Sequence, residues 1–385
     1  MQVKEKLEVE SRKLEEKQVI LCFQYSNMKY YLIAGERSGD LHASNLMKSL
    51  KVKDSEADFR FWGGDYMQSV GGEMVVHYRQ LAFMGFIEVV LNLFTISKFI
   101  KQCKKDIAEW QPDVLILVDY GGFNLKIADY AKKAGFKVVF YISPKVWAWN
   151  QNRAYKIKAR VDKMLCILPF EVDFYKKFDW DVEYVGNPVV EAVNAHKVNN
   201  NFLSENKLEN EIIAVLPGSR KQELNKILPT IATVIEQFPT QQFVVAGVNN
   251  LPVEMYAPVA KYKNVKMVFE QTYDLLHFAK SAIVCSGTAT LETAFFKTPQ
   301  VVIYKTSPIS YVIGKRVVKV KYMSLVNLIV NEEIVPELLQ HECTTERITT
   351  ELQKLLTHGI DYKSLTDIIG NKVASEEAAK SIVNL

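Results

Sequence analysis

The sequence predicts an α/β protein built from two Rossmann-like, doubly wound parallel-sheet domains that face each other across a cleft. Short apolar runs rich in β-branched residues alternate with amphipathic helical segments from Tyr30 onward, which is typical of parallel sheets covered by helices. The same alternation restarts after a polar segment at residues 196–210. At 385 residues the chain is also too long for one typical core and suits two domains.

The alternation divides the chain into four segments. We expect residues 1–27 to be a dispensable extension, with Met28 as the effective start; a partner-binding helical arm is the alternative. Residues 28–195 form the expected N-terminal domain, 196–344 the C-terminal domain and 345–385 a helical tail. Strands are predicted at 30–34, 59–62, 114–118, 137–141, 163–168 and 182–185 in the first domain, and at 212–216, 243–246, 265–268, 282–285 and 300–303 in the second.

Composition excludes several classes of protein. The content of 48% hydrophobic and 24% charged residues describes a globular chain, and the net charge of only +4 without a long basic block gives nucleic-acid binding no support. The five cysteines lie far apart without a CxxC pair, so we expect reduced thiols in a cytoplasmic protein and no structural zinc site. The apolar piece at 19–23 is too short to span a bilayer.

One turn in the second domain is suited to binding an anion. The apolar strand at 212–216 ends in Pro217 and is followed by Gly218, Ser219 and Arg220, where a helix begins. Free N–H groups and the positive end of the helix dipole attract phosphate there, and the arginine adds a planar cation. We therefore predict a nucleotide diphosphate at this turn. The alternative is an ordinary strand-to-helix turn with a surface arginine.

A second turn in the same domain has a similar character. Ser286, Gly287 and Thr288 follow a strand and open a helix, and their small side chains would let a ligand approach the helix N-terminus. Glu292 lies on the first turns of that helix, from which a carboxylate can reach the vicinal hydroxyls of a ribose.

The first turn of the N-terminal domain contains both glycines and carboxylates. It holds Gly35, Glu36, Ser38, Gly39 and Asp40 between a strand and a helix. The turn lacks the G-x-G-x-x-G of a dinucleotide site and the Lys-Ser/Thr of a P-loop, so a Rossmann dehydrogenase or an NTPase is not expected. The two acidic side chains could hold sugar hydroxyls of an acceptor, or could serve only as cap and turn residues.

Asp119 is the best general-base candidate of the first half. It stands where the apolar strand at 114–118 meets the turn Tyr120-Gly121-Gly122. Partial removal from water raises the pKa of a carboxyl group there and helps it to accept a proton from a hydroxyl. The alternative is an aspartate that only caps the next helix.

The segment at 141–149 is rich in aromatic residues. Ser143 and Trp147 lie in it beside Pro144 and Trp149, and such aromatic faces suit a sugar or acyl ligand or else a packed corner of the core. Asp179-Trp180-Asp181 is similar to the acidic triplet of metal-dependent glycosyltransferases, but it follows a helix away from the other loops, so no metal site is expected.

The stretch at 81–94 is too apolar for an ordinary surface loop, and several lysines follow it directly. A helix with this pairing could lie in a membrane interface with its apolar side among the acyl chains. A core helix and a pocket for an acyl chain are the alternatives. The candidate membrane or acyl contacts are Phe83, Met84, Phe86, Ile87 and Leu91.

Seven segments in order resemble the lipid-A-disaccharide synthase family, glycosyltransferases of the GT-B architecture in Gram-negative bacteria. One of them reads Leu216-Pro217-Gly218-Ser219-Arg220 and another Ser143-Pro144-Lys145-Val146-Trp147-Ala148-Trp149. The others lie at 34–40, 81–85, 168–171, 286–292 and 322–328. The likeness covers nearly the whole chain from Met28 onward.

The resemblance implies inverting transfer from UDP-2,3-diacylglucosamine to 2,3-diacylglucosamine 1-phosphate, giving a β-1,6-linked disaccharide 1-phosphate and UDP, without a cofactor. It implies that Asp119 is the base, that Arg220 acts at the diphosphate, that Glu292 holds the ribose and that Asn327 lines the cleft. The family's loop commonly carries a second acidic residue where this chain has Gly122, so Asp119 must act without it.

The resemblance further implies peripheral association with the cytoplasmic face of the inner membrane. It also implies a homodimer in which the segment at 345–385 is exchanged, or else crosses to the N-terminal domain. The alternatives are another GT-B enzyme that uses UDP-N-acetylglucosamine, namely a 2-epimerase or the peptidoglycan transferase, and a non-catalytic nucleotide-sugar or lipid-binding protein.

Overall fold

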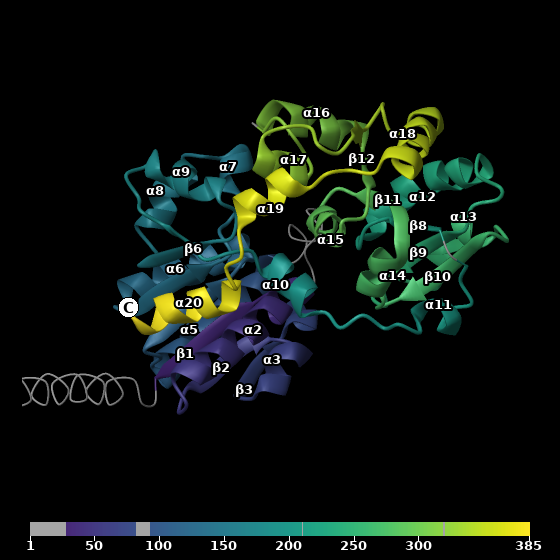
Figure 1. Cartoon of the computed structure of the whole chain (residues 1–385). Coiled ribbons are helices and arrows are strands. Elements are labelled where there is room, and N and C mark those ends of the chain that lie inside the picture. Colours follow the sequence, from purple (N-terminus) through teal and green to yellow (C-terminus); the bar gives the residue numbers. More distant parts are fainter. Residues whose placement is uncertain (1–27, 82–92, 210, 319) are drawn as a thin grey trace, which may run out of the picture. The chain divides into compact units, whose positions relative to one another are not determined.

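The computed structural model describes residues 28–81, 93–209, 211–318 and 320–385, and the chain divides into two compact units (Figure 1). The N-terminal unit runs to Val146 and includes Gln151–Gly186 and Lys372–Leu385. The C-terminal unit comprises Trp147–Asn150 and Asn187–Asn371. Each unit contains one parallel sheet with helices packed on it, which confirms the prediction of two parallel-sheet α/β domains.

The sheet of the N-terminal unit has the strand order β3-β2-β1-β4-β5-β6-β7, and all of its pairs are parallel. Its strands are β1 Lys29–Ala34, β2 Asp58–Gly63, β3 Glu73–His77, β4 Val114–Val118, β5 Lys137–Tyr141, β6 Lys163–Cys166 and β7 Glu183–Tyr184. Its helices are α2 Arg37–Lys53, α3 Asp65–Val70, α5 Leu93–Trp110, α6 Gly121–Lys133, α8 Arg153–Lys158, α9 Phe170–Lys176 and α20 Ala374–Val383, with a 3₁₀ turn η1 at Tyr78–Leu81.

The sheet of the C-terminal unit has the order β10-β9-β8-β11-β12-β13, again parallel throughout. Its strands are β8 Ile212–Leu216, β9 Phe243–Gly247, β10 Val265–Phe269, β11 Ala279–Cys285, β12 Gln300–Tyr304 and β13 Glu337–Leu339. Its helices are α10 Pro188–Ala195, α11 Phe202–Glu205, α12 Lys221–Glu236, α13 Ala257–Ala260, α14 Thr272–Phe278, α15 Ala289–Phe295, α16 Pro308–Val317, α17 Leu325–Val330, α18 Thr345–His358 and α19 Lys363–Ile369, with η2 at Val253–Tyr256; α7, Val146–Trp149, begins at the unit boundary.

The sequence prediction of the strands was incomplete at the sheet edges. Strands β3 and β13 were not predicted, because both are edge strands, one half-buried and the other only three residues long. The strand expected at 163–168 ends at Cys166, since Leu168 leads into α9, and that expected at 182–185 shrinks to two residues. The fully buried strands β4 and β8, and β5, which is buried apart from its first residue, have their predicted bounds.

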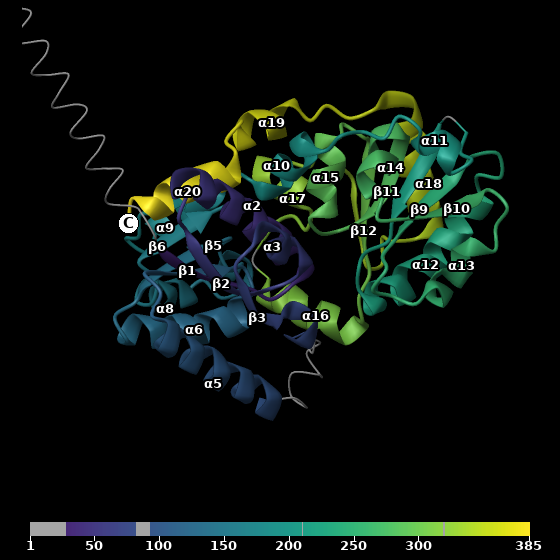
Figure 2. The same cartoon turned by 90° about the horizontal axis from the view of Figure 1, so that it is seen from below.

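Alternation along β1 places its side chains on opposite faces of the sheet. Tyr30, Leu32 and Ala34 belong to a core cluster with residues of α2 and α20, all buried. Tyr31 projects to the other face, where its hydroxyl donates a hydrogen bond of 2.6 Å to Asp106 of α5. The two views of the chain show α20 lying beside α2 (Figures 1 and 2).

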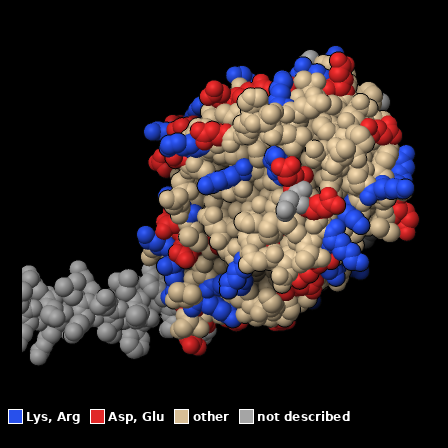
Figure 3. All heavy atoms as spheres, turned by 45° about the vertical axis from the view of Figure 1, so that its right-hand side comes forward, with Lys and Arg blue, Asp and Glu red and all other residues tan. Residues whose placement is uncertain are grey.

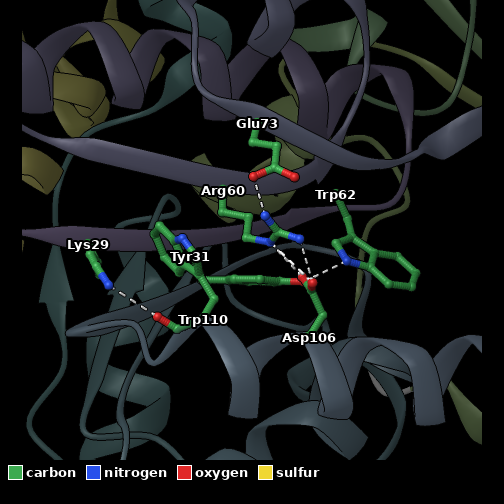
Figure 4. A network of polar contacts seen from close by, with 7 residues as sticks. All are labelled: Lys29, Tyr31, Arg60, Trp62, Glu73, Asp106 and Trp110. Atoms are coloured by element: carbon green, nitrogen blue, oxygen red, sulfur yellow. Dashed lines mark hydrogen bonds and ion pairs between the residues drawn. The ribbon is translucent and has the colours of Figure 1, made fainter.

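A polar network fixes α5 against this second face (Figure 4). The guanidinium of Arg60 on β2 donates to both carboxylate oxygens of Asp106 at 2.7–3.1 Å and pairs with Glu73 on β3. The Trp62 indole donates to the Tyr31 hydroxyl at 2.7 Å. Bidentate geometry and low exposure make such a pair stronger than an ordinary surface ion pair. Asp106 thus ties α5 to β1 and β2, and Arg60 extends the network to β3.

The cysteines, the length of the apolar helices and the surface charge can be compared with the sequence predictions. The four described cysteines are buried free thiols; Cys22 lies outside the described residues. Across the described ranges, no helix combines the length and the apolar character needed to cross a bilayer. Lys/Arg and Asp/Glu side chains are interspersed on the face shown in Figure 3, and the net charge is small.

Candidate functional site

In both sheets the strand order reverses at the middle, between β1 and β4 in one and between β8 and β11 in the other. Ligands of doubly wound sheets bind beyond the carboxyl ends of the strands at this switch point. The turns after these four strands are four of those that the sequence analysis selected, at 35–40, 119–124, 217–220 and 286–292. The sequence predicted the turns but not the strand order that brings them together in pairs, one pair in each unit.

Asp119 occupies a strained position at the end of β4. Its φ is 48° and that of Tyr120 is 53°, so two consecutive residues other than glycine adopt the left-handed conformation. Backbone strain of this kind concentrates at functional sites. Burial raises the pKa of the Asp119 carboxyl above its ordinary value, opposed by the charge of Lys145 and a hydrogen bond from the Tyr120 N–H. The raised pKa that the sequence predicted is thereby confirmed.

Gly35 is required where β1 meets α2. The ring of Tyr120 lies against it, and a Cβ on the glycine would come within 2.5 Å of three ring atoms. The glycine thus allows two adjacent turns to approach each other closely. Glu36 and Ser38 are exposed there, whereas Gly39 is buried.

Asp40 serves as a structural cap. It is 1% exposed, and its carboxylate accepts hydrogen bonds from the backbone N–H groups of Gly64, Tyr66 and Met67 at 2.7–3.1 Å. These groups belong to the first turn of α3, so the carboxylate satisfies the unpaired donors of that helix. Both of its oxygens are used in this way, which favours the cap alternative over a contact with acceptor hydroxyls.

The aromatic segment between β5 and α8 is mostly buried. Ser143 is 3% exposed and its hydroxyl shares a 2.7 Å hydrogen bond with the hydroxyl of Tyr175. Trp147 is 7% exposed, whereas Trp149 is 44% exposed. Ser143 and Trp147 are therefore each buried, which favours the core alternative for both, and Trp149 presents the more accessible aromatic face.

The turn after β8 leads from a buried strand into a helix as predicted, but the side chain of Glu223 is bonded to its backbone, which was not predicted. Gly218 has a φ of 104°, and Glu223 on the first turn of α12 accepts hydrogen bonds from the N–H groups of Ser219 and Arg220 at 3.1 and 3.2 Å. The expectation that these two N–H groups are free was wrong, because the helix caps itself with its own carboxylate. The Arg220 side chain is 75% exposed and lies 3.4 Å from the same carboxylate.

The turn after β11 is more open. Gly287 and Thr288 are exposed, and the Ser286 hydroxyl donates to the backbone oxygen of Met323 at 2.9 Å. Glu292 lies in the first turn of α15, as predicted. Burial raises the pKa of its carboxyl to about 7, opposed by a hydrogen bond with the Tyr273 side chain.

Asn327 has a different role from the one expected. It is fully buried, and its amide donates to Val335 and Glu337 at 2.8 Å and accepts from the N–H groups of Ile334 and Val335. All four hydrogen-bonding positions of the side chain are occupied. The residue braces a loop and offers nothing to a nucleotide, so the expectation that it binds UDP-sugar is corrected. Glu337, which the sequence analysis missed, also accepts from the N–H groups of Met323 and Ser324.

The predicted membrane or acyl contacts Phe83, Met84, Phe86, Ile87 and Leu91 lie outside the described residues. Beside them, Phe94 on α5 is 93% exposed, and Lys98 and Lys101 are exposed on the same helix. Within the described ranges, no group of three or more His, Cys, Asp or Glu side chains is arranged to hold a metal ion. Gly122 is exposed, and a Cβ built on it meets no atom within 4 Å.

Comparisons with known proteins give consistent results. A family model described as lipid-A-disaccharide synthetase matches residues 30–381. A lipid-A-disaccharide synthase of Geobacter metallireducens is 36% identical over 338 residues, covering 86% of this chain and 88% of the relative. One from Coxiella burnetii is 34% identical over 373 residues, covering 94% and 99%.

Among solved structures, the UDP-GlcNAc 2-epimerase of Neisseria meningitidis bound to UDP-GlcNAc is similar with a TM-score of 0.67 at 11% identity, covering 93% of this chain and 100% of the other. The glycotransferase of kitacinnamycin is similar with a TM-score of 0.63 at 12% identity, covering 92% and 98%. At such identities the likeness concerns the fold alone.

Proposed function

Because this chain belongs to the lipid-A-disaccharide synthetase family, we propose that it is an inverting glycosyltransferase of lipid A biosynthesis that joins UDP-2,3-diacylglucosamine to 2,3-diacylglucosamine 1-phosphate. The 6-hydroxyl oxygen of the acceptor attacks the anomeric carbon, the bond from that carbon to the diphosphate breaks, and UDP departs. The products are the β-1,6-linked disaccharide 1-phosphate and UDP.

Asp119 takes the proton of the attacking hydroxyl. The observation that carries this assignment is the strained, partly buried carboxyl at the switch point of the first sheet. A carboxyl group with a raised pKa is a stronger base than an ordinary aspartate. Lys145 keeps the carboxylate form available by its charge.

The turns of the C-terminal unit hold the donor. The Arg220 side chain is exposed and can exchange its 3.4 Å ion pair with Glu223 for a diphosphate, and the N-terminus of α12 directs its dipole to the same turn. Gly218 and Ser219 shape that turn, while Ser286, Gly287 and Thr288 allow the nucleotide to approach α15. Glu292 accepts hydrogen bonds from the ribose hydroxyls once its carboxyl is ionised. The negative charge that develops on departing UDP is stabilised by the Arg220 guanidinium and the positive end of the α12 dipole, so the proposal invokes no metal or cofactor.

The lipid substrates call for contact with the cytoplasmic face of the inner membrane. Support comes from the apolar stretch at 81–94 and from the exposed Phe94, Lys98 and Lys101 that follow it. Lysines above an apolar segment suit anionic head groups. The protein acts as a homodimer in this proposal. The relatives at 34–37% identity that carry the synthase name do not favour an epimerase or a binding protein.

The test is disaccharide formation from the two purified substrates in detergent micelles, with and without EDTA. Asp119→Asn is expected to lower kcat by at least about 100-fold, the usual contribution of a general base. Arg220→Ala is expected to cost a similar factor in kcat/KM, while EDTA leaves the rate unchanged. Asp181→Asn and Arg347→Ala, both at exposed positions, serve as matched controls. If Asp119→Asn turns over at the wild-type rate, a residue other than Asp119 is the base.

A further inference from the structure

We infer that Asn124 is a positioning residue, whose buried amide holds the backbone of Asp119 in the conformation from which its carboxylate acts as the base. The inference rests on the proposed function, because it deepens the role given to Asp119. Asn124 lies on the first turn of α6, five residues after the base, and is fully buried.

The amide nitrogen of Asn124 faces three backbone carbonyl oxygens. The shortest of its hydrogen bonds, 2.8 Å, goes to the oxygen of Asp119; the others go to Val118 at 3.3 Å and Ile33 at 3.4 Å. Three acceptors around one end of the side chain identify that end as the NH₂ group, because a carbonyl oxygen there would be repelled. One side chain thereby joins the carboxyl ends of β1 and β4 to the turn.

The backbone of Asp119 is held from both sides. Its N–H donates to the oxygen of Tyr141 on β5 at 3.0 Å, and its carbonyl accepts from Asn124. The left-handed φ values of Asp119 and Tyr120 are unfavourable for residues with a Cβ, and no glycine at these two positions relieves them. External contacts must therefore hold this conformation, and Asn124 supplies the one on the carbonyl side.

The other end of the amide argues against a role in packing alone. The Asn124 Oδ1 is buried and has no hydrogen-bond partner among the described residues. An unpaired buried acceptor destabilises a fold, and an apolar side chain of the same size would avoid that cost. The asparagine is thus explained by what its NH₂ group holds, which is the turn that carries the base.

The test replaces the amide by an apolar group of similar size. Asn124→Leu is expected to lower kcat at least tenfold with KM for the donor changed less than twofold, because the donor turns lie in the other unit. Release of the turn should also admit water to the Asp119 carboxyl and lower its pKa, since burial is what raises it. The acid limb of the kcat profile then moves to lower pH, with Lys145 and the Tyr120 N–H still facing the carboxyl.

Asn264→Leu is the matched control. The Asn264 amide also donates to two backbone carbonyls, those of Phe238 and Gln241, but it precedes β10 at the opposite end of its strand from the turns described. Asn264→Leu should therefore lower the melting temperature and leave kcat and its pH profile unchanged. Should Asn124→Leu fail to fold by circular dichroism, Asn124→Ser, which keeps one donor, is measured by the same criteria.

The outcomes separate the inference from the proposed function. If Asn124→Leu is less stable but keeps the wild-type kcat and pH profile, as the control does, the residue is only structural and the inference is overturned. If Asp119→Asn itself retains activity, the assignment of the base fails first. Loss of kcat in both Asp119→Asn and Asn124→Leu, with a displaced acid limb in the latter, supports both.

Discussion

The carboxyl group of Glu292 titrates close to neutral pH, because burial raises its pKa to about 7. A ribose hydroxyl needs an acceptor, so UDP should bind to the ionised form and favour it. We therefore expect the affinity of the wild-type protein for UDP to fall as the pH drops below about 7. Calorimetric titrations with UDP at pH 6, 7 and 8 measure this, and Glu292→Gln, which cannot ionise, shows how much of the change comes from UDP itself.

The same group gives a stability test that needs no ligand. Its folded-state pKa lies above the ordinary value of 4.5, so between these two values the folded chain binds more protons than the unfolded chain. The contribution of Glu292 to stability therefore falls as the pH rises from about 4.5 through 7. Melting curves should show Glu292→Gln gaining stability relative to wild type at pH 8 but not at pH 5; equal differences at both would argue against the raised pKa.

Single residues differ in how far the sequence alone could place them. Asp119 and Glu292 were predicted because each lies in or just after a turn that follows a buried strand, a position that shows in the order of residues. Asn327 was assigned by resemblance, and its saturated hydrogen bonds could be seen only in the fold. Glu223 and Asn124 escaped notice because their partners are backbone groups, which carry no sequence signal.

At the scale of elements, two glycines lower the stability of the first turn of α6. Gly121 and Gly122 occupy its first turn, and Gly122 is exposed with open space where a Cβ would lie. Replacement of a helical glycine and addition of a negative charge at the helix N-terminus each stabilise by up to about 1 kcal/mol. We expect Gly122→Asp to raise the free energy of unfolding by about 1 kcal/mol, as measured by urea denaturation.

The new carboxylate would also lie close in sequence to Asp119. Like charges disfavour ionisation, so Gly122→Asp should raise the pKa of Asp119 further and move the acid limb of kcat/KM to higher pH. Gly122→Ala is the control, because it removes the glycine without adding charge and should stabilise without moving the limb. If the acid limb of kcat/KM moves equally in Gly122→Asp and Gly122→Ala, a change in the backbone and not the added charge is the cause.

The elements themselves were predictable to the extent that they are buried. Strands such as β4 and β8 are continuous apolar runs, which the sequence marks clearly. Edge strands β3 and β13 lack that signature. The attachment of α5 through Arg60 and Asp106 joins residues 46 positions apart, and such pairing depends on the strand order, which local patterns do not determine.

At the scale of the whole chain, the last helix returns to the unit in which the sequence begins. Ala378, Ala379 and Ile382 of α20 are fully buried in the core cluster that also contains β1 and α2. Removal of a buried isoleucine side chain typically costs about 2–5 kcal/mol. Ile382→Ala should therefore lower the melting temperature markedly, whereas Ile368→Ala on α19, where the side chain is 42% exposed, should change it little.

The melting temperature also tests whether α20 packs on its own chain or is exchanged with a partner chain. If the helix packs on its own chain, the melting temperature is independent of protein concentration; if two chains exchange it, unfolding requires dissociation and the melting temperature rises with concentration. The exchange of tails that the family resemblance implies for the homodimer predicts such a rise over a hundredfold range, and predicts that Ile382→Ala shifts the protein toward monomer in analytical ultracentrifugation. A flat melting temperature together with an unchanged sedimentation profile would leave α20 as an intramolecular contact and would remove the exchange from the proposal.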